Sequence, residues 1–249
     1  MARTNIRTSG IRFAPMSSDF SGRREKVISG RSRSLVEIYP GVLLRELASQ
    51  ACGVQGMSTG LAIFSPASAL PYHRHDHRHG VSEAFTVLSA EALAMVEGRT
   101  YRMGPLDCLH LPAGDAHAVI NPSTKKKLMI HTAFGAVHPR RDFVKDSFLS
   151  VDRNYGLPDE NDPEHMVRIG KATRYKLATG ASFCDRFAGR FGSVGICGGY
   201  GEFQPGTGLP CHLHDYDESI TIIQGASEPQ RSLVNARFCH RDWEWEGKA

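Results

Sequence analysis

Hydrophobic positions in this chain fall into short runs from Leu35 onward, with Gly, Pro, Ser and Asn between them. Runs of about four to eight residues that are rich in β-branched and aromatic side chains and end at turn formers predict β-strands. We expect strands at residues 36–39, 42–47, 60–64, 84–88, 92–96, 100–103, 107–111 and 128–133. Glu97-Gly98-Arg99 lies between two alternating runs and predicts a hairpin turn. This succession of short strands predicts an all-β barrel or sandwich.

Three segments depart from the strand pattern. Around residues 138–147, the apolar side chains Phe143, Val144 and Phe148 stand at helical spacing, which predicts a helix between domains. Residues 154–164 are rich in Pro, Asp, Asn and Gly and predict a linker. Residues 122–127 carry three lysines and predict an exposed basic loop.

The sequence repeats itself at an offset of 139 residues. Without a gap, the repeat matches Gly41 with Gly180, Phe64 with Phe203, and residues 70–75 (LPYHRH) with residues 209–214 (LPCHLH). After the histidines the offset falls to 135, because Glu83 then matches Glu218. A register kept over this length indicates an internal duplication of one domain.

The duplication divides the chain into four parts. Residues 1–34 have few apolar positions and no period, and predict a flexible arm rich in arginine. We expect a first barrel at residues 35–147, a linker at 148–174 and a second barrel at 175–249.

Composition narrows the classes of function and partner. No apolar run approaches the roughly 18 residues that cross a bilayer, and residues 1–34 lack the apolar centre of a signal peptide, so we expect a cytoplasmic protein with no membrane partner. The six cysteines include no CxxC pair and suit buried thiols in a reducing compartment. The net charge is +4, but seven arginines lie in the first 34 residues. No basic-aromatic motif accompanies them, so we expect no nucleic-acid partner.

The repeated histidines carry the candidate chemistry. Residues two apart in a strand project to the same face, so His212 and His214 would present two imidazoles together. A tight turn and a returning strand at residues 220–223 would bring Glu218 opposite them. The first copy contains a third histidine downstream, His117.

These residues are similar to the two motifs of the cupin superfamily. The first motif, G(X)5HXH(X)3-4E(X)6G, fits Gly206, His212, His214, Glu218 and Gly225. The second motif, G(X)5PXG(X)2H(X)3N, fits Pro112, Gly114, His117 and Asn121, with Leu106 in place of the opening glycine. From about residue 35 the chain therefore resembles a bicupin. The resemblance implies tandem jelly-roll barrels, each able to hold a metal through two His and one Glu of the first motif and one His of the second.

The first copy permits two ligand sets, because His73, His75, His77 and His79 alternate ahead of Glu83. The match to the LPxHxH repeat favours His73, His75, Glu83 and His117, with an insertion before Glu83. The usual spacing of the motif favours His77 and His79 instead. We prefer the first set, because an insertion is cheaper in a hairpin turn than inside a buried strand.

The second copy lacks its final histidine. The counterpart of His117 would fall at position 252, beyond Ala249, and residues 227–249 show no strand alternation. We therefore expect a truncated second barrel that keeps only His212, His214 and Glu218 as ligands. Its bare strand edges favour association, and we expect a homodimer.

Three His and one Glu suit a divalent transition metal, either Fe, Mn, Ni, Co or Zn. The resemblance implies a metal-dependent enzyme for a small polar, anionic metabolite, either a dioxygenase or a redox-neutral isomerase, lyase or decarboxylase. The alternatives are a cupin that binds a small molecule or metal without catalysis, and a truncated remnant with little activity. No catalytic residue besides the ligands is identifiable from the sequence.

Overall fold

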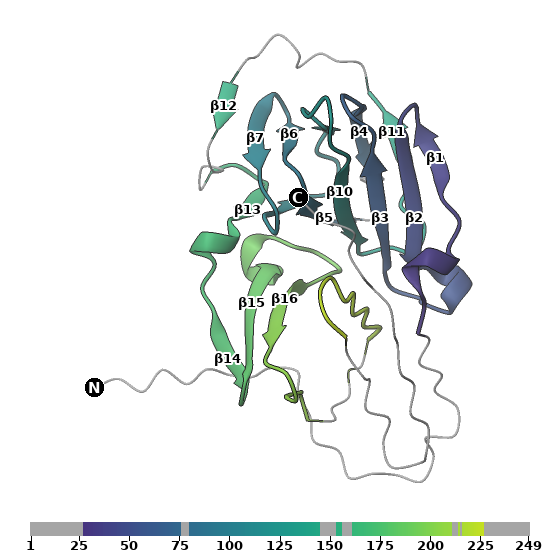
Figure 1. The fold of residues 1–249 in the computed structure, drawn as a ribbon. Helices are drawn as coiled ribbons and strands as arrows, with labels where there is room; N and C mark the ends of the chain where they lie inside the picture. Colours follow the sequence, from purple (N-terminus) through teal and green to yellow (C-terminus); the bar gives the residue numbers. More distant parts are fainter. Residues whose placement is uncertain are drawn as a thin grey trace.

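Alternating apolar and polar residues produce strands that pair into three sheets. The computed structural model describes residues 27–75, 80–144, 153–155, 161–210, 214 and 216–226. Within these ranges the secondary structure consists of strands and short 3-10 turns, with no α-helix. The prediction of an all-β protein is therefore confirmed (Figure 1).

Two sheets face each other and enclose the main core. The first sheet has the order β1 (Val36–Tyr39), β2 (Val42–Ala48), β3 (Ser58–Phe64), β10 (Leu128–Phe134), β5 (Glu83–Ser89), β8 (Cys108–Leu111) and β13 (His165–Val167). The second has the order β11 (Arg141–Phe143), β4 (Ala69–His75), β9 (His117–Ile120), β6 (Ala92–Val96), β7 (Arg99–Met103) and β12 (Arg153–Tyr155). Inward residues of both sheets, among them Phe64, Phe85, Val96, Tyr101 and Leu109, pack in one buried cluster. Burying these apolar surfaces drives the two sheets together.

The hairpin predicted at residues 97–99 joins β6 to β7. Val96 pairs with Arg99, so the turn contains two residues, Glu97 at φ 46° and Gly98 at φ 87°. Two successive positive φ values define the tight hairpin turn whose twist matches that of the strands. The prediction is confirmed.

The third sheet repeats the first three strands of the barrel. It consists of β14 (Tyr175–Ala178), β15 (Ala181–Phe187) and β16 (Gly198–Phe203). The bounds of β14 and β15 lie 139 residues after those of β1 and β2, as does the end of β16 relative to β3. The tight turns repeat too, with φ 76° at Gly41 and 72° at Gly180. The sequence duplication is therefore also a repeat of structure, and the division into two barrels stays a prediction.

The repeated sheet is less covered than the original. In the described part of the chain, β16 pairs only with β15, whereas β3 pairs with both β2 and β10. Phe64, on β3, is 1% exposed, but its counterpart Phe203 is 47% exposed.

Several polar contacts attach the repeated unit to the barrel. Arg186 of β15 is buried and donates to the backbone carbonyls of Leu106 and Val167. The carboxylate of Asp217 accepts the backbone N–H groups of Gln55 and Gly56 at 2.7 and 3.1 Å. The loop after the second HxH motif therefore lies against the first barrel.

Two of the secondary-structure predictions are wrong. The helix expected at residues 138–147 is replaced, within the described residues, by strand β11, which pairs with β4. Pairing with an available sheet edge outweighed a weak helical spacing of apolar residues. The strand expected at residues 220–223 does not form, and Ile220 there is 74% exposed.

No helix in the described ranges is long and apolar enough to cross a bilayer.

Candidate metal centre

Four polar side chains converge between the two large sheets. His73 and His75 come from β4 and His117 from the neighbouring strand β9. His73 and His117 are paired across these strands, so their side chains project to the same side. Glu83 reaches toward them from β5 in the opposite sheet. All four residues are buried.

An irregularity in β4 places the first histidine inside the barrel. Leu70 belongs to the main core, and strict alternation would send a side chain three positions later to the outside. The pairing of β4 with β9 shifts register between Leu70 and His73, a span that contains Pro71, which has no N–H for the sheet. His73 therefore shares the inner side with Leu70, while Tyr72 packs in a separate cluster with Ala116 and Ala118.

The backbone fixes the orientation of all three imidazoles. Nδ1 of His73 lies 2.8 Å from the carbonyl of Pro71, and Nδ1 of His75 lies 3.0 Å from that of Arg140. Nδ1 of His117 lies 3.0 Å from the carbonyl of Asp115. A carbonyl only accepts, so each Nδ1 carries the hydrogen and donates. In the neutral imidazoles each Nε2 therefore presents a lone pair to the centre.

The carboxylate oxygen and the imidazole nitrogens that converge have no hydrogen-bond donor among them. Oε2 of Glu83 lies 3.3 Å from Nε2 of His75 and 2.9 Å from Nε2 of His117. None of these three buried atoms has a hydrogen-bond partner among the described residues. Because both partners in each contact are acceptors, a proton or a metal ion must lie between them.

The electrostatics of the cluster favour a bound cation. Burial would raise the pKa of Glu83, but the neighbouring His75 and His117 outweigh burial and hold it well below its usual value. Burial, together with His117, lowers the pKa of His73 well below its usual value. An ionised carboxylate beside an imidazole that resists protonation, His73, suits metal binding.

The four residues fit a first-row transition metal. One ligand atom from each lies within 4.8 Å of the others. Three nitrogens and one carboxylate oxygen suit Fe, Mn, Ni, Co or Zn better than the all-oxygen ions Ca and Mg. The structure thus brings together the preferred set of the first copy. The competing histidines, His77 and His79, lie outside the described residues, so the choice of ligands stays a prediction.

The other histidines of the first barrel that the structure describes lie apart from this cluster. His110 is fully buried on β8 and paired with His165 across the sheet. His131 contacts Thr221, and His138 contacts Gln50.

The second motif is not assembled in the same way. His212 lies outside the described residues. Nε2 of His214 is 3.7 Å from Oε1 of Glu218, whose side chain is 47% exposed, compared with 8% for Glu83. A metal site at His212, His214 and Glu218 remains a prediction.

The last position of the second motif has a structural role. Asn121 is fully buried, and its amide donates to the carbonyls of Phe64, Ser65 and Lys126. Its Oδ1 accepts the backbone N–H of Ser123. The side chain therefore ties the end of β9 to two loops and does not reach the metal cluster.

Sequence reasoning missed three side chains near the centre. The ring of Phe134 lies 4.7 Å from that of His75, and the ring of Phe143 lies 6.1 Å from that of His73. Arg141 is paired with His75 across β11 and β4. Phe134 lies one residue beyond the strand predicted at residues 128–133, and Arg141 and Phe143 fall where a helix was expected; none of the three belongs to either motif.

A buried carboxyl also lies beside the second motif. Burial, with Glu97 and Glu164 nearby, raises the pKa of Asp115 to about 6. The carboxylate of Glu164 accepts hydrogen bonds from Nε and Nη2 of Arg99, each at 2.6 Å, and from the hydroxyl of Tyr101 at 2.6 Å. This network fastens the segment before β13 to β7.

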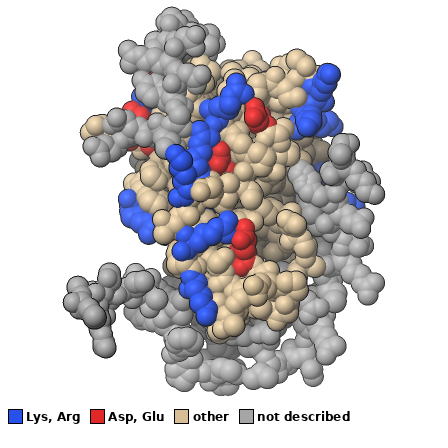
Figure 2. Space-filling model, turned by 60° about the vertical axis from the view of Figure 1, so that its left-hand side comes forward, with Lys and Arg blue, Asp and Glu red and all other residues tan. Residues whose placement is uncertain are grey.

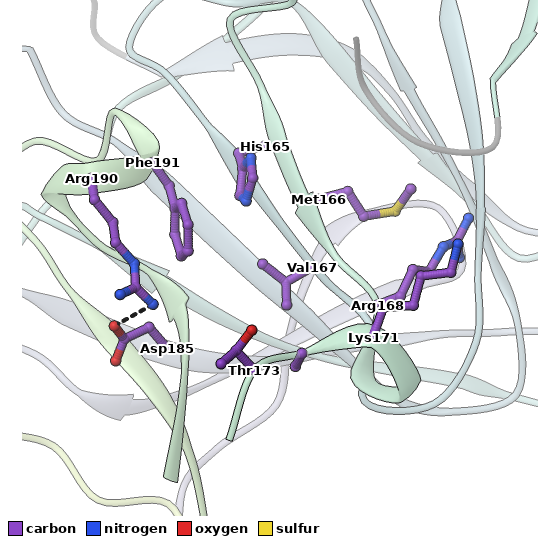
Figure 3. A pocket seen from close by; sticks show the side chains of 10 residues that line it. His165, Met166, Val167, Arg168, Lys171, Thr173, Asp185, Arg190 and Phe191 are labelled. Atoms are coloured by element: carbon purple, nitrogen blue, oxygen red, sulfur yellow. Dashed lines mark ion pairs between the residues drawn. The ribbon is translucent and has the colours of Figure 1, made fainter. Parts of the chain in front are cut away.

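A separate groove lies where the repeated sheet meets the barrel. It has a volume of about 200 Å³, and its walls include His165, Arg168, Lys171 and Phe191 (Figure 3). The ring of Phe191 stacks on His165 at 4.2 Å, and Arg190 forms an ion pair with Asp185 at 2.7 Å. None of the converging ligands lines it.

Basic side chains on this side of the molecule alternate with acidic ones (Figure 2). Arg168 pairs with Asp107 at 2.7 Å, and Arg174 with Glu202 at 2.5 Å. These cations are therefore engaged in ion pairs within the fold.

Comparison with solved structures gives several similar barrels. KdgF from Halomonas sp. is 15% identical and is matched over 48% of this chain and 97% of its own, with a TM-score of 0.39. The polyketide cyclase RemF from Streptomyces resistomycificus is 17% identical over 50% of this chain and 90% of its own, with a TM-score of 0.42. An RmlC-like cupin from Shewanella frigidimarina is 15% identical over 51% and 97%, with a TM-score of 0.39.

Comparison with curated proteins gives no match. The sequence profile of the family described as "Cupin domain" matches residues 60–134, a range that contains all four converging residues. Residues 60–134, in the first barrel, therefore match the cupin domain family.

Proposed function

We propose that this chain is a metal-dependent bicupin enzyme that acts on a small, anionic metabolite. One observation carries the proposal. Three imidazoles, each oriented by a backbone carbonyl, aim their Nε2 atoms at a buried carboxylate with no donor between them. A purely structural cluster of this kind would bury acceptors against acceptors, which is costly.

His73, His75, Glu83 and His117 would hold the metal. When bound, it would supply a Lewis acid with open coordination positions that polarises an oxygen of the substrate or activates dioxygen. The protein would supply the rest of the environment. The carbonyls of Pro71, Arg140 and Asp115 hold the imidazoles in one tautomer, which strengthens them as ligands.

Aromatic side chains beside the ligands favour a dry site. The ring of Phe134, which is buried, packs against His75 inside the barrel, whereas Phe143, 6.1 Å from His73, is half exposed and lies at the outer edge of the site. Excluding water strengthens electrostatic interactions with a charged substrate. Such an environment suits catalysis better than storage of an exchangeable ion.

The bicupin part of the proposal rests on the repeated strand unit at residues 175–203. We propose that residues 35–147 form the working barrel and residues 175–249 belong to a second one, joined by residues 148–174. The exposed Glu218 supports weaker metal binding in the second unit.

Substrate screening of metal-loaded protein tests the proposal. A panel of small carboxylates would be incubated with protein loaded separately with Fe, Mn, Ni, Co and Zn, while product formation and oxygen uptake are followed together. We expect turnover with at least one metal, abolished in His117→Ala and retained in His138→Ala, whose side chain contacts Gln50 instead. Oxygen uptake that matches product would identify a dioxygenase, and product without uptake a redox-neutral enzyme. Stoichiometric metal without turnover across the panel would favour the non-catalytic binder, and absence of metal the remnant.

A further inference from the structure

The pairing of β11 with β4 directs Arg141 toward the metal cluster. Arg141 lies directly opposite His75, and Phe143 directly opposite His73. Directly opposed residues of antiparallel strands project to the same face of a sheet. The ring of Phe143 lies 6.1 Å from that of His73, so this face is the one that carries the histidines. Arg141 therefore projects to the side of the sheet that carries the converging histidines.

The guanidinium of Arg141 is incompletely satisfied in the described part of the chain. Its Nε atom is buried without a hydrogen bond. Burial lowers the pKa of Arg141, and the carboxylate of Glu83 opposes that shift, so the cation lies within the electrostatic reach of the cluster. Neighbouring Arg140, in contrast, is exposed and pairs with Asp142 at 3.0 Å.

A largely buried cation with an unsatisfied N–H group is costly unless an anion joins it. Glu83 cannot fully provide that anion once it shares its charge with a divalent metal. Three neutral imidazoles, one carboxylate, one guanidinium and a divalent ion leave a net positive charge inside the barrel. This balance favours an anionic ligand between the metal and Arg141.

We propose that Arg141 binds the carboxylate group of a small substrate beside the metal, an assignment that rests on the proposed function. A guanidinium matches a carboxylate by two parallel N–H···O bonds, which fixes orientation as well as charge. The rings of Phe143 and Tyr39 lie 5.6 Å apart, and both are partly exposed at this edge of the barrel. The substrate class is thus a small carboxylate that reaches the metal with its charged end.

Cobalt-loaded protein allows this to be measured without turnover. Glycolate and its neutral amide, glycolamide, would each be titrated into the Co(II) form while the visible absorption of cobalt is followed. Bound Co(II) would be counted separately by elemental analysis, and folding compared by thermal unfolding. Arg74→Gln is the matched control, because Arg74 is exposed on β4 between the two histidines, and its loss removes the same charge from the opposite face.

We expect Arg141→Gln to retain cobalt and to bind glycolate about ten- to a hundredfold more weakly than wild type. Arg141→Lys keeps the charge without the planar guanidinium, so its glycolate affinity should lie between those of wild type and Arg141→Gln. The glycolate affinity of Arg74→Gln should match that of wild type. Glycolamide affinity should be the same in all four proteins. Equal glycolate affinity in cobalt-loaded wild type and Arg141→Gln would overturn the role of Arg141 and leave the proposed function standing. Failure of wild type to take up cobalt would overturn the proposed function together with it.

Discussion

Nε2 of His117 lies 2.9 Å from Oε2 of Glu83, and neither atom has a hydrogen-bond partner in the described structure. Nδ1 of His117 carries its hydrogen toward the carbonyl of Asp115, so the short contact joins two acceptors. The contact allows two roles of Glu83 to be told apart: a ligand for a metal ion, or a carboxylate that only stabilises the fold. The two roles predict opposite effects when a neutral amide replaces the carboxylate at position 83.

Glu83→Gln should therefore stabilise the metal-free protein and weaken metal binding. The amide can donate to Nε2 of His117, which removes the conflict between acceptors and the cost of burying a charge. Metal at about a hundred times its Kd adds about 2.7 kcal/mol to the wild-type unfolding free energy, and most of this gain should vanish in the variant. Thermal unfolding with added Zn and with chelator measures both effects. A variant whose melting temperature still rises with Zn as in wild type would remove Glu83 from the ligand set.

The stability of the metal-free protein should fall as the pH is lowered. Burial, with His165 nearby, lowers the pKa of His110 to about 4, and burial lowers that of His131 to about 4. Between the ordinary histidine pKa of about 6.5 and pH 4, the unfolded chain binds protons that the folded chain does not. The free energy of unfolding should fall by up to about 1.4 kcal/mol per pH unit for each histidine. Above pH 6.5 these two groups should contribute no pH dependence.

Urea unfolding at pH 7.5 and 5 in the presence of chelator checks this prediction. The variant His110→Gln lacks one of the two titrating groups, so its unfolding free energy should fall less between the two pH values than that of wild type. An equal fall in both proteins would show that His110 does not resist protonation in the folded state.

Asn121 should matter for stability rather than for metal binding. Asn121→Ala leaves three carbonyls and one N–H without their buried partner and should cost about 2 to 4 kcal/mol. Asn121→Asp should cost more, because a carboxylate would face the same carbonyls. Both variants, if folded, should keep wild-type metal content. Loss of metal from a folded Asn121→Ala protein would give this residue a role at the site.

The exposed face of the repeated sheet should support self-association. Phe203 is 47% exposed where its counterpart Phe64 is 1% exposed, and large exposed apolar groups beside an open strand edge favour pairing between chains. We expect wild type to sediment as a dimer. Phe203→Glu should shift it toward monomer without lowering the melting temperature, whereas Phe64→Glu should unfold the barrel. A monomeric wild type at high concentration would contradict the prediction.

Strand positions were predictable because burial on one side imposes alternation. The segment at residues 92–96 alternates buried Ala92, Ala94 and Val96 with less buried neighbours, and its bounds agree with the prediction. The repeated LPxHxH segment pointed to His73 and His75, and the second motif pointed to His117, although the usual spacing of the first motif favoured His77 and His79. The sequence separations of the residues that converge reflect the strand pairing that a closed barrel requires.

The elements that were missed depend on contacts that the sequence does not encode locally. Strand β11 has only three residues, and its conformation is set by the edge of β4 rather than by its own periodicity. Arg141 consequently escaped notice, since its importance comes from facing His75 across that edge. The segment at residues 220–223 has the composition of a strand but forms none in the described structure. β-branched residues favour a strand only where a partner strand is available.

The metal content of single-ligand variants tests the central claim most directly. Purified wild type, His117→Ala, His73→Ala and His77→Ala would be loaded with Zn, freed of loose metal and analysed for Zn per chain. The account predicts that wild type and His77→Ala keep the barrel metal, and that His117→Ala and His73→Ala lose it, because three ligands hold a first-row ion less tightly than four. Stoichiometric Zn in His117→Ala, or loss in His77→Ala with retention in His73→Ala, would contradict the assigned centre.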